Sequence, residues 1–290
     1  MRYTFVMTIR DALKNSFLPA ADSEVLLSKA LGKDRAWLLA HPEEPLTPEA
    51  WATFTNFVER RRKSEPVAYI TGEQEFYGRI FNVDPRVLIP RPATEGVVRA
   101  AMDVLKHFDD INPKSQTGNP NVGFGNWDSG FSLEVDSGIV VTTRILRRLD
   151  KPKLIVDLGT GSGCIAVTLA CECPDMRVIA TDVSSDALDV ARSNAIKHHV
   201  NDRMECREGN GMEPVKDITE PFLLVTNPPY VPSVRTLMPD VQNYEPHVAI
   251  FGGGEGMDVI GSIVTDAKAH PMCVGIIMES ETTQVNLLIR

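Results

Sequence analysis

The sequence predicts a mixed α/β protein in which a small all-helical N-terminal domain precedes a larger domain built on a parallel sheet. Three patterns indicate this fold class. Apolar residues recur at helical spacing up to about residue 75, an aromatic and β-branched stretch follows, and short apolar strands alternate with helices from residue 154 onward. Such alternation is typical of a doubly wound parallel sheet. A chain of 290 residues is long enough for two domains.

Residues 1–75 are expected to form a small helical bundle that serves as a separate domain. Apolar periodicity indicates two short helices before residue 32. A longer helix begins after Thr47, which suits an N-cap because Pro48 follows it at the first helical position. The basic run at residues 59–63 ends this helix. It is either a solvated last turn, which the helix dipole favours, or a basic surface for a partner.

Residues 76–92 are expected to form a β-hairpin linker that continues as an extended segment. Aromatic and β-branched residues flank Gly78, which suits the turn, and two prolines hold the following stretch extended. The larger domain then occupies residues 93–290. Within it, residues 107–137 are rich in Asn, Gly, Pro, Ser and Asp, and we expect a flexible insertion there, because long unstructured loops are uncommon inside compact domains.

Strands and helices are expected to alternate through the rest of the larger domain. Four short apolar runs read as buried strands and three periodic stretches as helices. In chain order they are the strand Leu154–Leu158, the helix Cys164–Cys171, the strand Arg177–Thr181, the helix Ser184–His199, the strand Phe222–Val225, the helix Glu255–His270 and the strand Cys273–Met278.

Composition argues against several classes of function. Residues 151–290 carry 11 basic against 19 acidic side chains, which disfavours sequence-specific nucleic acid binding because such affinity comes from cations that displace counterions. No stretch approaches the ~18 apolar residues of a membrane span, so no membrane association is expected. We expect a cytoplasmic protein, or a mitochondrial one if the source is eukaryotic. No CxxC pair occurs, so neither a disulfide framework nor a metal site is expected from the five cysteines Cys164, Cys171, Cys173, Cys206 and Cys273.

A glycine-rich turn joins the first strand of the larger domain to its helix. Glycines there let the backbone approach a ligand closely and leave helix N–H groups pointing at it. Cys164 stands where the dinucleotide fingerprint needs a third spaced glycine, which favours a ligand without a pyrophosphate. The alternative is a tight turn with no ligand. The turn consists of Asp157, Leu158, Gly159, Thr160, Gly161, Ser162 and Gly163.

Asp182 ends the second strand of this domain, 23 residues after Gly159. A carboxylate at that place can accept hydrogen bonds from both hydroxyls of a ribose. The alternative is that Asp182 only caps the helix that begins near Ser184.

The tetrapeptide Asn227, Pro228, Pro229 and Tyr230 follows another apolar strand, at the end of a sheet where α/β proteins bind ligands. The Asn227 side-chain oxygen and the Pro228 carbonyl can accept the two N–H bonds of an NH₂ group. The prolines make this backbone rigid, and Tyr230 can pack on a planar substrate group and a nearby cation. We expect these four residues to be catalytic. The alternative is a proline-rich strand exit.

Together, the glycine turn, Asp182 and the tetrapeptide resemble the class I S-adenosylmethionine-dependent methyltransferases. Within that class the chain is similar to the release factor glutamine methyltransferases, and the similarity covers most of the chain outside residues 107–137. The segments that carry it are Glu65–Gly72, Phe76–Gly78, Leu88–Pro92, Tyr244–His247 and Phe251–Gly253.

This resemblance implies a Rossmann-like catalytic domain and an N-terminal domain that docks the substrate. It implies S-adenosyl-L-methionine as cofactor, with S-adenosyl-L-homocysteine as product. The reaction would be methylation of the side-chain amide N5 of the Gln in the Gly-Gly-Gln motif of peptide chain release factors, which act in translation termination. The partner is then a protein substrate, and a monomer is expected.

The resemblance also assigns site residues. The cofactor would be held by Asp157, Gly159, Thr160, Gly161, Gly163, Asp182, Asn210 and Asn227. The substrate Gln would be held by Arg91, Glu95, Asn227, Pro228 and Tyr230.

Three departures from the family pattern accompany this resemblance. Ala93 stands where an acid is usual, and Asn210 stands near where an Asp meets the adenine amine, although Asn can accept the same bond. The family continues past the position of Arg290 into a closing pair of strands. A helical segment over residues 284–290 is therefore expected to leave an edge of the sheet uncovered.

Three other functions stay open at this point. The first is a methyltransferase that acts on a glutamine of a ribosomal protein. The second is an adenine-N6 methyltransferase of nucleic acid, which shares Asn-Pro-Pro-Tyr but fits poorly with the acidic C-terminal half. The third is a divergent member that binds S-adenosylmethionine without catalysis.

Overall fold

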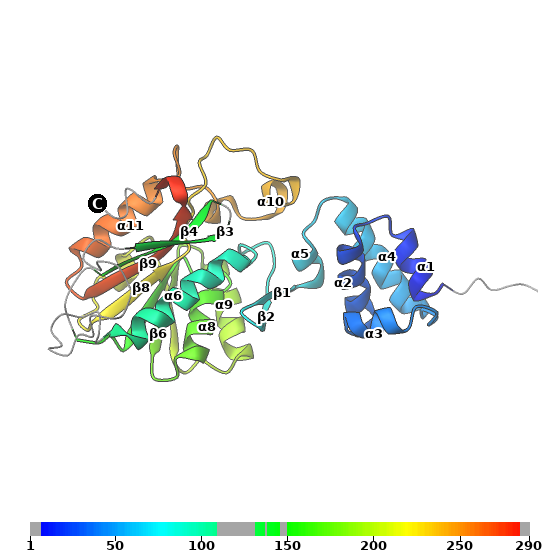
Figure 1. Ribbon diagram of the computed structural model, residues 1–290, viewed down its shortest axis with the longest axis horizontal. Coiled ribbons are helices and arrows are strands. Elements are labelled where there is room, and N and C mark those ends of the chain that lie inside the picture. Colours follow the sequence, from blue (N-terminus) through cyan, green and yellow to red (C-terminus); the bar gives the residue numbers. More distant parts are fainter. Residues whose placement is uncertain (1–6, 109–130, 137, 146–149, 285–290) are drawn as a thin grey trace, which may run out of the picture. The chain divides into compact units, whose positions relative to one another are not determined.

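The chain is described by a computed structural model that covers residues 7–108, 131–136, 138–145 and 150–284 (Figure 1). It forms two compact units. One contains the residues up to Glu73 together with Leu237–Tyr244, and the other contains Gln74–Thr236 and the residues from Glu245 onward. The segment Leu237–Tyr244 therefore belongs to the helical unit, although it follows the Asn-Pro-Pro-Tyr tetrapeptide in the chain.

The helical unit is built around one apolar cluster that includes Leu26, Leu27 and Phe54. The predicted N-cap is confirmed, because the Thr47 hydroxyl accepts the N–H of Ala50 at 3.1 Å. The helices are α1 (Ile9–Asn15), α2 (Ala20–Leu31), α3 (Arg35–Ala40), α4 (Pro48–Arg62), α5 (Val67–Thr71) and α10 (Pro239–Tyr244).

The basic run at the end of α4 stabilises the helical unit from within. Arg60 pairs with Glu65, and Arg61 pairs with Asp22 at 2.7 Å. Arg62 donates to the carbonyl at the end of α1 at 2.9 Å. The run lies in the last turn of α4, as expected, and Arg62 is exposed there, while the unit itself supplies an acceptor for each of these three arginines.

The predicted hairpin is present as β1 (Glu73–Phe76) and β2 (Arg79–Asn82). Its two-residue turn is Tyr77-Gly78, with φ of +53° and +71°. Positive φ at both positions matches the type I′ turn, whose twist suits the two strands.

Within the described ranges, seven strands form one sheet in the order β3-β4-β9-β8-β5-β6-β7. The five strands from β9 to β7 are parallel, which confirms the predicted α/β class. Four of these five parallel strands are largely buried, and β7 is the more exposed one. The strands are β3 (Phe131–Asp136), β4 (Ile139–Ile145), β5 (Leu154–Leu158), β6 (Arg177–Asp182), β7 (Met204–Glu208), β8 (Phe222–Thr226) and β9 (Cys273–Glu281).

Helices cover both faces of this sheet, as a doubly wound fold requires (Figure 1). One face packs against α6 (Glu95–Lys106), α8 (Cys164–Glu172) and α9 (Ser185–Lys197). The other packs against α11 (Asp258–Ala269). Short 3₁₀ turns complete the unit at η1 (Pro92–Thr94), η3 (Glu213–Val215), η4 (His247–Ala249) and η5 (Thr282–Gln284).

The antiparallel strands β3 and β4 correct two expectations. β4 pairs with β9 from Ile139 opposite Glu281 to Ile145 opposite Gly275, so the edge expected to be uncovered is paired. The reason is that β4 is a β-branched run whose Val140 and Val141 bury themselves against the sheet.

The expected flexible insertion at residues 107–137 is also wrong where the structure describes it. Residue 108 is a buried phenylalanine, and β3 is a strand of the sheet that pairs with β4. Residues 109–130 and 137 lie outside the described residues, as do residues 285–290, for which a helix was expected.

Candidate functional site

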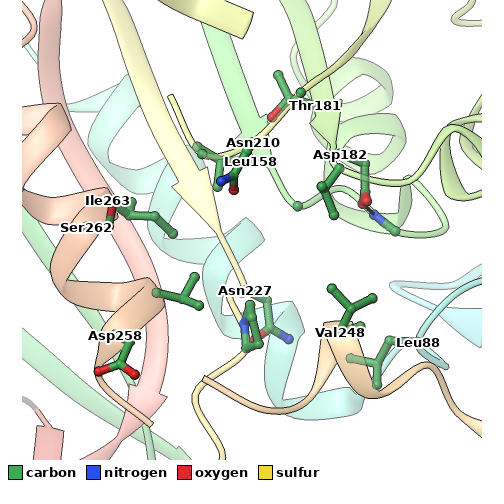
Figure 2. A pocket seen from close by; sticks show the side chains of 18 residues that line it. Leu88, Leu158, Thr181, Asp182, Asn210, Asn227, Val248, Asp258, Ser262 and Ile263 are labelled. Atoms are coloured by element: carbon green, nitrogen blue, oxygen red, sulfur yellow. Dashed lines mark hydrogen bonds between the residues drawn. The ribbon is translucent and has the colours of Figure 1, made fainter. Parts of the chain in front are cut away.

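A cavity of about 370 Å³ opens at the carboxyl ends of β5, β6 and β8 (Figure 2). Its volume falls within the ~300–1,000 Å³ range of small-molecule sites. The cavity brings together six of the predicted site residues, which come from four separate segments of the chain: Gly159, Gly161, Asp182, Asn210, Asn227 and Pro229. The predicted residues outside its lining, as the described residues define it, are Arg91, Glu95, Asp157, Thr160, Gly163, Pro228 and Tyr230.

The glycine turn has the backbone conformation that glycine tolerates best. Gly159, Gly161 and Gly163 have φ of +71°, +53° and +79°. A Cβ on Gly163 would lie 3.1 Å from the Cβ of Ala191, so this glycine also allows α9 to pack closely against the turn. Gly159 and Gly161 line the cavity, so their backbone is open to a ligand.

Asp157 stabilises the glycine turn from the protein interior and does not line the cavity. Its side chain is fully buried, and its Oδ2 accepts the Thr160 hydroxyl at 2.6 Å and the N–H of Ala166 at 3.1 Å. Burial raises the pKa of Asp157 to about 7, although both hydrogen bonds oppose that rise. The structure therefore places Asp157 and Thr160 as supports of the turn.

Asp182 is tied to the glycine turn and lines the cavity. Its Oδ2 accepts the N–H of Gly161 at 2.9 Å, and its Oδ1 accepts the N–H of Ser184 at 3.0 Å. Burial raises its pKa, and these backbone hydrogen bonds oppose the rise. The hydroxyl of Ser184 itself caps α9 by accepting the N–H of Ala187, so Asp182 is not needed as the cap. Each carboxylate oxygen has a further lone pair for a ligand.

The remaining cavity wall is largely apolar, and sequence reasoning missed most of it. Figure 2 shows Leu88 and Val248 on one side and α11 with Asp258, Ser262 and Ile263 on another. Asp258 and Ser262 stand four residues apart, a spacing that places two polar side chains on one face of a helix. That spacing was the available sequence signal for α11. Leu88 belongs to the segment Leu88–Pro92 that carries the resemblance, but nothing in the sequence placed it at the cavity, and no local pattern marked Val248.

Asn227 and Tyr230 are each held by a side chain from a distant part of the sequence. The Asn227 Nδ2 donates to the hydroxyl of Thr94 at 2.9 Å, and the Tyr230 hydroxyl donates to Oε1 of Glu279 at 2.9 Å. Burial raises the pKa of Tyr230, and the nearby Glu279 raises it further. Tyr230 is therefore a neutral donor at physiological pH.

Arg91 and Glu95 are outside the cavity lining and make structural contacts. Arg91 pairs with Glu245, whose buried side chain also accepts the N–H of Ile89 at 3.2 Å. These contacts fasten the extended linker to the segment that follows the tetrapeptide. Glu95 accepts the N–H of the hairpin residue Tyr77 at 3.1 Å.

We also searched the described part of the chain for metal-binding clusters and for membrane-spanning helices. It holds no group of three or more His, Cys, Asp or Glu side chains that could bind a metal ion. Its helices include none that is long and apolar enough to cross a membrane.

Comparison with known proteins finds similar proteins over most of the chain. Residues 6–72 match the family model of the PrmC N-terminal domain, and residues 131–244 match that of the methyltransferase small domain. The release factor glutamine methyltransferase of Koribacter versatilis is 34% identical over 91% of this chain and 82% of its own length. That of Chlorobaculum tepidum is 40% identical over 80% of this chain and 68% of its own.

A longer relative is the bifunctional methyltransferase of Rickettsia typhi, which is 36% identical over 87% of this chain. The chain spans 44% of that protein's length. Among solved structures, a SAM-dependent methyltransferase from Geobacter sulfurreducens in complex with S-adenosyl-L-homocysteine is 23% identical over 28% of this chain and 31% of its own. Its TM-score is 0.24, which is too low to carry an argument about function.

Proposed function

The chain belongs to the family of release factor glutamine methyltransferases, and we propose that it methylates the side-chain amide N5 of the Gln in the Gly-Gly-Gln motif of peptide chain release factors. The methyl donor would be S-adenosyl-L-methionine. One observation carries this proposal: a single cavity is lined by the glycine turn, by Asp182 and by Asn227. The proposed site for a ribose-bearing cofactor and the proposed site for an NH₂ group would then share one space.

The residues of the cavity fit this cofactor. The Asp182 carboxylate suits the ribose hydroxyls, and the backbone of Gly159 and Gly161 is open to a close approach. The carboxylates of Asp182 and Asp258 favour a cation. Val183, which is 53% exposed and lines the cavity, offers an apolar surface for an adenine ring. Bound S-adenosyl-L-methionine would supply an electrophilic methyl group on a positively charged sulfur.

The tetrapeptide would hold and orient the substrate amide. An amide nitrogen is a weak nucleophile because its lone pair is delocalised into the carbonyl. Asn227 Oδ1 and the carbonyl of Pro228 would accept its two N–H bonds and so turn the nitrogen lone pair toward the methyl group. Two consecutive prolines keep that backbone rigid. The tetrapeptide contains no strong base, so we infer that the proton leaves after the transfer.

This proposal is tested with radiolabelled methyl donor and three substrates: a release factor, a ribosomal protein and an adenine-containing DNA. Label is expected in the release factor alone, and the Asn227→Ala variant is expected to incorporate almost none. Label in the DNA or only in the ribosomal protein would contradict the proposed substrate. Cofactor binding without label in any substrate would support a non-catalytic member instead.

A further inference from the structure

Asn227 takes its side-chain orientation from a residue 133 positions earlier in the chain. Its Nδ2 donates to the hydroxyl of Thr94 at 2.9 Å. Thr94 is 2% exposed and belongs to η1, the turn that begins α6. A buried hydroxyl at this place is therefore in contact with the tetrapeptide side chain that is proposed to accept a substrate N–H.

The third group, after Asn227 and Thr94, is the buried carboxylate of Glu279. Glu279 of β9 is 1% exposed, and its Oε1 accepts the Tyr230 hydroxyl. Its Oε2 has no hydrogen-bond partner within the described residues. Burial raises the pKa of Glu279, while Thr94, Tyr230, Asn227 and the charge of Arg91 act in the opposite direction and favour its ionised form.

The direction of the hydrogen bonds follows from what each group can do. An ionised carboxylate only accepts, and a hydroxyl has a single proton to give. If Thr94 gives its proton to Glu279, its oxygen is left to accept from Asn227. The Asn227 Nδ2 then faces Thr94, and its Oδ1 is free to accept from a ligand. Were Thr94 to donate to Asn227 instead, the amide would turn around and present its own NH₂ to the substrate.

We propose that Thr94 and Glu279 are positioning residues that fix the Asn227 amide with its oxygen available to the NH₂ group of the substrate. This inference rests on the function proposed above. Neither residue belongs to the cavity lining within the described part of the chain, so both act through Asn227. Together they would make the site selective for a group that donates two hydrogen bonds, such as a primary carboxamide.

The hydrogen bond between Asn227 and Thr94 is tested by replacing the Thr94 hydroxyl. Thr94→Val keeps the shape of the side chain and removes the acceptor, and we expect kcat to fall roughly tenfold, which is the effect of one hydrogen bond of ordinary net strength. The Kd for the cofactor is expected to stay within about twofold. Thr94→Ser restores the hydroxyl and is expected to restore kcat. A Thr94→Ser variant as slow as Thr94→Val would overturn the proposal.

Thr168→Val is the matched control for the loss of a buried threonine hydroxyl. Thr168 lies on α8, is fully buried, and its hydroxyl has no hydrogen-bond partner among the described residues. We expect kcat of this variant to equal that of the wild type. An equal loss in Thr168→Val and Thr94→Val would attribute the effect to packing and would contradict the positioning role.

The proposed interaction between Thr94 and Glu279 is tested by replacing the Glu279 carboxylate. Glu279→Gln gives residue 279 a donor, so Thr94 no longer has to donate to it and the Asn227 amide can turn around. We expect kcat to fall about as far as in Thr94→Val. The double variant Thr94→Val/Glu279→Gln is expected to be little slower than either single variant, because both act through one chain of hydrogen bonds. Additive losses would contradict the coupling.

A readout that needs no catalysis separates this inference from the proposed function. With selective ¹⁵N-asparagine labelling, NMR measures solvent exchange of the Asn227 side-chain NH₂ in the protein alone. We expect slow exchange in the wild type and in Thr168→Val, and at least tenfold faster exchange in Thr94→Val. Unchanged exchange in Thr94→Val would overturn the inference even if the enzyme is active. If no release factor is methylated, the proposed function fails and the exchange result still decides this point.

Discussion

Asp182 Oδ2 accepts the backbone N–H of Gly161 at 2.9 Å, which joins the end of β6 to the glycine turn that follows β5. The two residues also line the same cavity. This hydrogen bond fixes the carboxylate relative to the turn, so the two parts of the proposed cofactor site are positioned together before any ligand binds.

The Asp182 carboxylate is expected to contribute directly to cofactor affinity. Asp182→Asn keeps an acceptor for Gly161 but loses the charge, and we expect the Kd for S-adenosyl-L-methionine to rise roughly 10- to 100-fold, the usual effect of one charge-assisted hydrogen bond. Isothermal titration calorimetry measures this. Asp186→Asn, on the exposed face of α9, is the matched control and should leave the Kd unchanged. An unchanged Kd in Asp182→Asn would remove Asp182 from the site.

Asn227 is expected to act on the substrate rather than on the cofactor. Asn227→Ala removes the side-chain acceptor, so methyl transfer should fall at least a hundredfold while the cofactor Kd stays within about threefold. Steady-state kinetics and calorimetry on the same preparation measure the two effects. Turnover equal to that of the wild type would contradict the assigned role.

The Gly163→Ala substitution is expected to loosen the turn more than Gly161→Ala. Both positions have positive φ, which costs a residue with a Cβ about 1–2 kcal/mol. Only at Gly163 would the new Cβ also crowd Ala191, whereas nothing lies within 4 Å at Gly161. Thermal unfolding should therefore show a lower Tm for Gly163→Ala. In an Ala191→Gly background the Tm loss caused by Gly163→Ala should be smaller than in the wild type, and an equal loss in both backgrounds would argue against the contact.

Asp157 is expected to make stability depend on pH. Its folded-state pKa of about 7 lies above its ordinary value of 3.8, so the folded protein holds this proton to higher pH than the unfolded chain does. Its contribution to stability is therefore greatest below about pH 4 and is lost as pH rises to about 7.

The variant Asp157→Asn stays neutral and isolates this contribution. We expect the free energy of unfolding of Asp157→Asn, minus that of the wild type, to be larger at pH 8 than at pH 5, because only the wild type loses stability over this range. Urea unfolding at the two pH values measures the difference. A difference that does not change with pH would contradict a raised pKa.

The parts of the fold and site that could be predicted are those determined by residues close together in the sequence. The glycine turn, Asp182 and Asn227 each follow an apolar strand, and parallel strands bring their carboxyl ends to one edge of a sheet. These three positions meet in the cavity. The hairpin at Tyr77-Gly78 was predictable for the same reason, because two neighbouring residues determine its turn.

Features that depend on distant pairing were not predictable in this way. Thr94 and Glu279 reach the tetrapeptide from η1 and β9, and no spacing along the chain relates them to it. Strand β7 was missed because its residues are mostly half-exposed or polar, so it lacks the apolar run of its neighbours. Strand β4 does carry a local signal, the β-branched run Ile139–Ile145, which was overlooked, whereas its place beside β9 and its pairing with β3 depend on distant parts of the chain.

Mass spectrometry of a release factor tests the central claim most directly. The factor is incubated with the protein and S-adenosyl-L-methionine, digested, and its Gly-Gly-Gln peptide is fragmented. We predict a mass increase of one CH₂ group located on the Gln side chain, and its absence with Asn227→Ala. An unmodified Gln after incubation with cofactor-binding wild-type protein, or a methyl group on any other residue, would contradict the account.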